Sequence, residues 1–134
     1  MSVLSMDWTG DLNFAASAGS PPMELHSSTP GMASPTQALA YAAMACMAMD
    51  VVHVMSKGRH EFSALSVKCE SARADKPPRR YTAMHLHFDI TGTVAPHVVE
   101  RAIELSKTTY CSVWNSLRTD IDFKTTFSIQ PPIS

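Results

Sequence analysis

The sequence predicts an α+β fold in which antiparallel β-sheets pack around one long central helix. A segment rich in Ala and Met between Ser34 and Lys57 is long enough for a helix of about 34 Å at 1.5 Å per residue. Shorter segments before and after it alternate apolar and polar residues, as strands do. With 134 residues, the chain is expected to form a single domain, 1–134, around one core.

The first part of the chain, 1–33, is expected to hold short strands followed by a loop. Thr9-Gly10 and the Gly/Ser/Pro cluster at 19–22 are typical of turns between strands. The strand-like segments between these turns are 2–8, 11–17 and 22–27. A Ser/Thr/Pro/Gly loop then leads to the long helix.

The central helix is predicted over 34–57. Ser34 is a suitable N-cap, Pro35 suits the first helical position, and Lys57-Gly58 suits the end. Because residues 38–49 are apolar on all sides, we expect this helix to be buried over most of its circumference.

The rest of the chain predicts a strand pair (61–92), a broken helix (95–119) and a last strand (121–129). Thr108 or Thr109 is expected to cap the second half of the broken helix. Within the strand pair, alternation gives one apolar face, on which Cys69 is expected to pack as a core residue. The apolar positions of the second strand are Met84, Leu86, Phe88 and Ile90.

Composition limits the possible partners. The chain is 45% hydrophobic and 17% charged, with a formal net charge of −1, and its 11 basic residues form no stripe, which argues against nucleic acid. The longest uncharged run, 37–49, is too short to cross a bilayer. The N-terminus lacks the pattern of a signal peptide, so we expect a soluble, cytoplasmic protein with free thiols and no membrane partner.

One stripe of the central helix carries groups with chemical potential. Cys46, Asp50 and His53 stand at i, i+4 and i+7, where a nucleophile, a base and an orienting group could meet. The alternative is that Cys46 packs in the core as a small hydrophobic residue.

Two further sites are candidates. Cys111 is predicted in the first turn of a helix that begins near Thr109, where free N–H groups favour a thiolate; burial is the alternative. His85 and His87 lie at i, i+2 on one strand face, a spacing that can bind metal. Without a third ligand, a solvated polar face is the simpler interpretation of this pair.

Taken together, three segments resemble the OsmC/Ohr family of thiol-dependent hydroperoxide reductases, and more specifically its OsmC-like branch. These segments are "SPTQALAYAAMACMAMDVVHVMSKGR", "SARADKPPRRYTAMHLHFDITG" and "VVERAIELSKTTYCSVWNSL". The resemblance implies an intertwined homodimer with two equivalent sites at the subunit interface. It implies no cofactor and no bound metal.

The resemblance also implies a mechanism. Cys46 would attack an organic hydroperoxide as a thiolate and become a sulfenic acid, Cys111 would condense with it to a disulfide, and a dithiol reductant would open that disulfide. Gln37, Asp50 and His53 are possible supporting residues.

The sequence departs from the family at the group that activates the thiol. Characterised peroxidases of the family pair an arginine from the N-terminal strands with a glutamate at the start of the long helix. Here residues 1–56 contain no Arg or Lys, and Thr36 or Gln37 stands where the glutamate is expected. A buried thiol without a cation has a raised pKa. Three alternatives remain. A histidine of the partner chain activates Cys46, a later arginine does so, or Cys111 attacks the substrate in place of Cys46. The later arginines are Arg59, Arg73, Arg79 and Arg80.

Two other functions stay open from the sequence. One is a non-catalytic OsmC-like dimer that binds a small apolar or thiol-reactive ligand, or that senses redox state through a Cys46–Cys111 disulfide. The other is a metal-binding or hydrolytic protein that uses His85, His87 or the stripe on the central helix.

Overall fold

The computed structural model describes residues 1–133, which form two compact units. The first comprises Met1–Tyr41 and the second begins at Ala42. The helices and strands follow the predicted order along the chain. Each unit has its own internal contacts, so the structure does not test whether the chain is a single domain, and that expectation stays a prediction.

The N-terminal unit contains a three-stranded antiparallel sheet in the order β1-β2-β3. A tight turn at Gly10 and Asp11, both with positive φ, joins the first two strands. Large apolar side chains such as Trp8 and Phe14 remain exposed. The three strands are shorter than predicted: β1 is Met6–Gly10, β2 is Asn13–Ala16 and β3 is Glu24–His26.

Helix α1 spans Pro35–Lys57, as the sequence predicted. Its start is fixed by a reciprocal pair of hydrogen bonds between Ser34 and Gln37. The Gln37 amide N–H donates to Ser34 Oγ at 3.2 Å, and the Ser34 amide N–H donates to Gln37 Oε1 at 2.9 Å. This arrangement is a capping box, which satisfies two backbone donors that the helix would otherwise leave free.

The burial of α1 differs from the prediction. Only one stripe of the helix is buried, made of Ala43, Met47, Val51 and Met55. On the other side Met49 is 69% exposed. The expectation of burial around most of the circumference is therefore wrong for a single chain, because apolar composition does not tell how many neighbours a helix has.

Among the described residues one helix, α1, is long and apolar enough to cross a membrane, with a mean hydropathy of 1.6. The sequence prediction considered only the uncharged run 37–49, which is shorter than the apolar part of this helix. The core helix of a soluble protein passes the same test, so this measure does not distinguish the two cases.

The second unit is built on a sheet of three strands in the order β4-β5-β6. Strands β4 (Phe62–Arg73) and β5 (Tyr81–Gly92) are antiparallel, whereas β6 (Asp122–Gln130) runs parallel to β5. The antiparallel expectation therefore fails for β6. The connection from β5 to β6 crosses over through a helix, and such a crossover returns the chain to the same end of the sheet.

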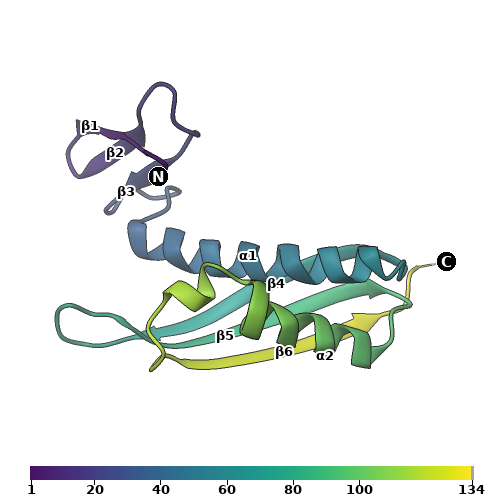
Figure 1. Cartoon of the computed structure of the whole chain (residues 1–134). Helices are drawn as coiled ribbons and strands as arrows, with labels where there is room; N and C mark the ends of the chain where they lie inside the picture. Colours follow the sequence, from purple (N-terminus) through teal and green to yellow (C-terminus); the bar gives the residue numbers. More distant parts are fainter. Residues whose placement is uncertain (134) are drawn as a thin grey trace. The chain divides into compact units, whose positions relative to one another are not determined.

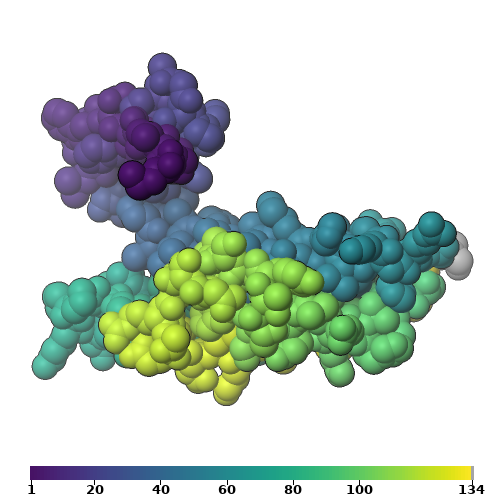
Figure 2. All heavy atoms as spheres, viewed as in Figure 1, coloured from purple at the N-terminus to yellow at the C-terminus, as the bar shows by residue number. Residues whose placement is uncertain are grey.

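Helices cover one face of this sheet. Figure 1 shows α2 (Pro96–Leu105) and the second half of α1 on the same side of β4-β5-β6. In the space-filling view the green segment around residues 100–118 lies directly against α1 (Figure 2). The core between these layers includes Met47, Val51, Met55, Leu86, Phe88, Ile90, Val99, Ala102, Ile103 and Cys111.

The chain after α2 holds the largest local departure from prediction. The helix continues past Leu105 into a π-helical turn, Ser106–Tyr110, and a short 3₁₀ turn follows at Trp114–Ser116. Thr108 is not a cap, since its hydroxyl donates to the Glu104 carbonyl at 2.8 Å. The expected helix start near Thr109 is therefore wrong, and Cys111 ends one helical segment instead of beginning another.

Candidate functional site

Three potential ligand or reactive atoms come together in the second unit. The sulfurs of Cys46 and Cys111 and a carboxylate oxygen of Asp50 all lie within 4.8 Å of one another. Cys46 and Asp50 are one turn apart on α1, as the sequence predicted, and Cys111 comes from the segment after the π-helical turn. Both predicted redox cysteines thus lie side by side within one chain.

Cys111 is positioned by hydrogen bonds from its own segment. Its amide N–H donates to the Ser106 carbonyl at 2.7 Å, which closes the π-helical turn. The Trp114 amide N–H donates to Cys111 Sγ at 3.2 Å, and the Asn115 side chain donates to the Cys111 carbonyl at 2.8 Å. The Trp114 ring stacks on Phe123 of β6, with 3.9 Å between ring centroids. π-Helical turns often occur at functional sites, and this one sets the direction of the thiol.

Ser106 is a site residue that the sequence reasoning missed. It is fully buried, and its hydroxyl donates to Asp50 Oδ2 at 2.8 Å. The signal was present in the pattern, because Ser106 is the only polar position in the buried stripe of this helix. The other members of that stripe are Val99, Ala102 and Ile103.

Burial controls the chemistry of Cys111. The pKa of the Cys111 thiol is raised to about 11, mainly by burial and to a smaller extent by the neighbouring Cys46 and Asp50, against the opposing effect of the Trp114 amide. The predicted thiolate-favouring helix start at Cys111 is therefore wrong. One backbone N–H, that of Trp114, does lower the Cys111 pKa, but burial raises the pKa by more.

Three of the four arginines proposed as activators are engaged elsewhere. Arg73 donates to the Arg79 carbonyl and Arg79 to the Ala74 carbonyl, so both bind the connection between β4 and β5. Arg80 donates to the Tyr81 carbonyl and approaches Asp120 at 3.6 Å. None of the groups that shift the Cys111 pKa in the described residues is a cation.

A cavity of about 580 Å³ opens beside the cluster. Asp50 belongs to its wall, and His53, which is exposed, lines the same cavity. The predicted stripe is thus divided: Cys46 and Asp50 join Cys111, while His53 faces the cavity outside this cluster. The remaining lining residues are Val54, Lys57, Gly58, Leu105 and Tyr110.

Two other predicted residues have clear structural positions. Gln37 lies in the N-terminal unit and uses its carboxamide in the capping box. A supporting role for it stays a prediction. Cys69 packs partly buried against the core, as predicted, and burial raises its pKa above the ordinary value, with a smaller contribution from Glu70.

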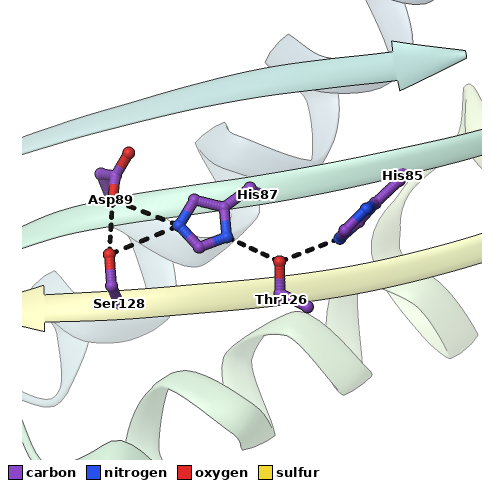
Figure 3. A network of polar contacts seen from close by, with 5 residues as sticks. All are labelled: His85, His87, Asp89, Thr126 and Ser128. Carbon is purple, nitrogen blue, oxygen red and sulfur yellow. Dashed lines mark hydrogen bonds and ion pairs between the residues drawn. The ribbon is translucent and has the colours of Figure 1, made fainter.

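His85 and His87 belong to a polar network on the open face of the sheet (Figure 3). His85 Nε2 and His87 Nδ1 both lie within hydrogen-bonding distance of Thr126 Oγ1, at 2.9 and 2.6 Å. The other nitrogen of His87 is 3.2 Å from Asp89, which also accepts a hydrogen bond from Ser128. In Figure 3 Asp89 lies on one side of His87 and His85 on the other, with Thr126 between the two imidazoles, so the three side chains do not converge on one point. These contacts favour the solvated polar face.

Comparisons with known proteins agree with this fold. Protein YhfA of Escherichia coli K12 is 41% identical over 81 residues, which cover 60% of this chain and 60% of YhfA. The chain thus aligns with about three fifths of that relative's length.

Two solved structures illustrate the structural likeness. A hypothetical protein from Aquifex aeolicus VF5 has a TM-score of 0.88 at 20% identity, over 99% of this chain and all of the other. The organic hydroperoxide resistance protein OsmC from Legionella pneumophila has a TM-score of 0.67 at 22% identity, over 96% and 98% of the two chains. At these identities the likeness establishes the fold alone, and it confirms the predicted α+β, OsmC-like class.

The family itself is established by sequence. A model of the OsmC-like protein family matches residues 28–126, which contain α1, β4, β5, the first half of β6 and both cysteines of the cluster. The resemblance noted in the sequence is therefore confirmed, and this chain belongs to the OsmC-like protein family.

Proposed function

We propose that this protein reduces organic hydroperoxides, with Cys46 as the attacking thiol and Cys111 as the resolving thiol. The observation that carries the proposal is the closeness of the two thiols within one chain, next to Asp50, which lines a cavity. The solved Legionella relative is named an organic hydroperoxide resistance protein, which supports the same class of reaction.

The different burial of the two cysteines supports this assignment of roles. Cys46 is half-buried, whereas Cys111 is fully enclosed and holds its proton to about pH 11. Cys111 is hydrogen-bonded to Cys46, so its S–H can stabilise negative charge on the Cys46 sulfur. The more accessible thiol therefore meets the substrate, and the buried one waits for the product of that reaction.

The reaction balances in three steps. The Cys46 thiolate attacks the terminal oxygen of R–O–OH, the O–O bond breaks, and the alcohol ROH leaves after it takes up a proton. The Cys111 thiol then attacks the sulfenic sulfur, so that an S–S bond forms and water leaves. A dithiol reductant exchanges with this disulfide, is itself oxidised to a disulfide, and returns two thiols to the protein.

Steady-state turnover tests the proposal. Reduced wild-type protein with an alkyl hydroperoxide and dithiothreitol is expected to consume peroxide, Cys46→Ser to lose this activity, and Cys111→Ser to accumulate a Cys46 sulfenic acid that dimedone traps. Cys69→Ser, which removes a thiol outside the cluster, is the matched control and keeps the activity. Absence of turnover in the wild type, or unchanged turnover in Cys46→Ser, would refute the proposal.

One observation favours a second candidate, a redox sensor without rapid turnover. The high pKa of Cys111 and the lack of a cation among the groups that shift it both slow thiol chemistry at neutral pH. A sensor would form the Cys46–Cys111 disulfide once in the presence of peroxide, but a dithiol would not sustain peroxide consumption. The turnover experiment therefore separates the two functions.

We also propose that the chain acts as a homodimer. The unburied side of α1, where Met49 is exposed, and the exposed Trp8 and Phe14 of the N-terminal sheet are apolar surfaces that a second copy could cover. Sedimentation equilibrium of wild type and Met49→Glu tests this, with dissociation of the variant as the expected result. Cytoplasmic location, without nucleic-acid or membrane partners, stays a prediction from the sequence.

A further inference from the structure

We propose that the reduced protein binds a soft divalent cation such as Zn²⁺ through Cys46 Sγ, Cys111 Sγ and a carboxylate oxygen of Asp50. This binding requires no peroxide and does not depend on the proposed turnover. Nothing in the family comparison assigns a metal to this cluster.

The geometry of the three donors fits a tetrahedral ion. Zn–S bonds of about 2.3 Å and Zn–O bonds of about 2.1 Å place the donors roughly 3.6–3.8 Å apart in a tetrahedral site. The three atoms already lie within 4.8 Å of one another. They come from two elements, α1 and the segment after the π-helical turn, so side-chain movements of about 1 Å or less bring them to bonding distance.

The electrostatics of the cluster also favour a cation. The site joins two sulfur donors and a carboxylate, and Arg73, Arg79 and Arg80 donate hydrogen bonds to groups elsewhere in the described chain. A divalent ion supplies the positive charge that two thiolates and a carboxylate require. Thiolate ligands select ions such as Zn²⁺ over Mg²⁺ or Ca²⁺.

The groups around the donors resemble the outer layer of a metal site. The buried Ser106 hydroxyl donates to Asp50 Oδ2, and the Trp114 amide donates to Cys111 Sγ, so both ligands are held in fixed directions. Asp50 also borders the cavity, which gives an ion and a fourth ligand, water, access to the site. Three protein ligands and one open position is an arrangement that zinc adopts in proteins.

Two consequences distinguish this site from adventitious binding. Each thiol releases one proton to solvent when the metal binds, so apparent affinity rises with pH. Formation of a Cys46–Cys111 disulfide consumes both sulfur ligands, so oxidation must release the metal.

Cobalt titration of the reduced protein tests the proposal. Wild type and the control Cys69→Ser are expected to bind one Co²⁺ per chain with a thiolate-to-cobalt charge-transfer band, and Zn²⁺ is expected to displace the cobalt. Cys46→Ser and Cys111→Ser are expected to weaken binding by about 100-fold or more, because loss of an outer-layer partner alone costs roughly 10- to 100-fold. Asp50→Asn, which replaces the charged ligand with a neutral amide, is expected to weaken binding by about 100-fold, and Ser106→Ala, which removes an outer-layer partner, by about 10-fold.

A second measurement uses the unaltered protein, so it does not depend on the folding of variants. Diamide is expected to abolish the cobalt band and reduction to restore it, and Zn²⁺ is expected to protect Cys46 and Cys111, but not Cys69, from alkylation. Loss of the band in Cys69→Ser, retention in both Cys46→Ser and Cys111→Ser, or a band that survives oxidation would overturn the proposal.

Discussion

The second unit contains two polar clusters on opposite sides of the same sheet, and both are built around a serine hydroxyl bound to an aspartate. In the thiol cluster Ser106 donates to Asp50 beside Cys46 and Cys111. In the histidine network of Figure 3, Ser128 donates to Asp89 beside His87. The local pairing is the same, but the reactive groups and their surroundings differ.

The difference between the clusters is burial. Ser106 and Cys111 are 0% exposed, and lack of water raises the pKa of Cys111 to about 11. Asp89 keeps contact with solvent, and the Ser128 hydrogen bond holds its pKa below the ordinary value of 3.8, with smaller help from His87. Similar hydrogen bonds therefore accompany a neutral thiol at the buried Cys111 and an ionised carboxylate at Asp89 on the open face.

The largest expected contrast between the clusters is in peroxide turnover. Cys46→Ser should reduce turnover to the rate of the uncatalysed reaction, because the hydroxyl cannot replace the thiolate as nucleophile. His87→Gln, on the open face, should leave the rate unchanged. Peroxide consumption measured at matched protein concentration checks both variants, and a comparable loss in His87→Gln would mean that the open face takes part in the reaction.

The second prediction concerns how disulfide formation in the buried thiol cluster depends on pH. With a Cys111 pKa of about 11, the thiolate fraction at Cys111 rises about tenfold per pH unit below that value, so disulfide formation should accelerate from neutral to alkaline pH. Single-turnover fluorescence of Trp114 reports the step, since its amide contacts the Cys111 sulfur. The Trp8→Phe background removes the other tryptophan. A rate that levels off near pH 8 would show that Cys111 is not the limiting thiol.

The third contrast compares the two serines directly. Ser106→Ala should destabilise the protein by about 1–2 kcal/mol, because it removes a buried hydrogen bond to a carboxylate. Ser128→Ala should cost about 0.5 kcal/mol or less, since water can replace its hydroxyl. Urea unfolding of both variants measures the difference, and equal losses would mean that burial does not separate the clusters.

How far the sequence predicted these features depends on the range of the interactions. The Ser34–Gln37 capping box and the alternation in β5 are local, so the bounds of α1 and the buried face of β5 were predicted correctly. The spacing of Cys46 and Asp50 along one helix face was predictable for the same reason.

Features that depend on distant partners were not predictable. The Ser106–Asp50 bond joins residues 56 positions apart, and the raised pKa of Cys111 results from burial beneath elements that its own segment does not specify. The parallel pairing of β6 follows from the path of the crossover, which alternation within one strand cannot reveal. Cys111 was singled out for a helix start that the structure does not contain, and its pairing with Cys46 was expected from the family resemblance alone.

The smallest expected effect concerns acid stability on the open face. Because the folded state lowers the Asp89 pKa, its ionised form adds stability above the ordinary pKa of 3.8, and this contribution is lost as pH falls through the lowered value. Asp89→Asn should therefore flatten the pH dependence of unfolding in the acid range, whereas Asp75→Asn removes an exposed charge from the β4–β5 connection and serves as the control. Urea midpoints measured from neutral to acid pH provide the comparison. If both variants follow the wild-type curve, the hydrogen bonds of Figure 3 add nothing to stability, and solvent screens the open face completely.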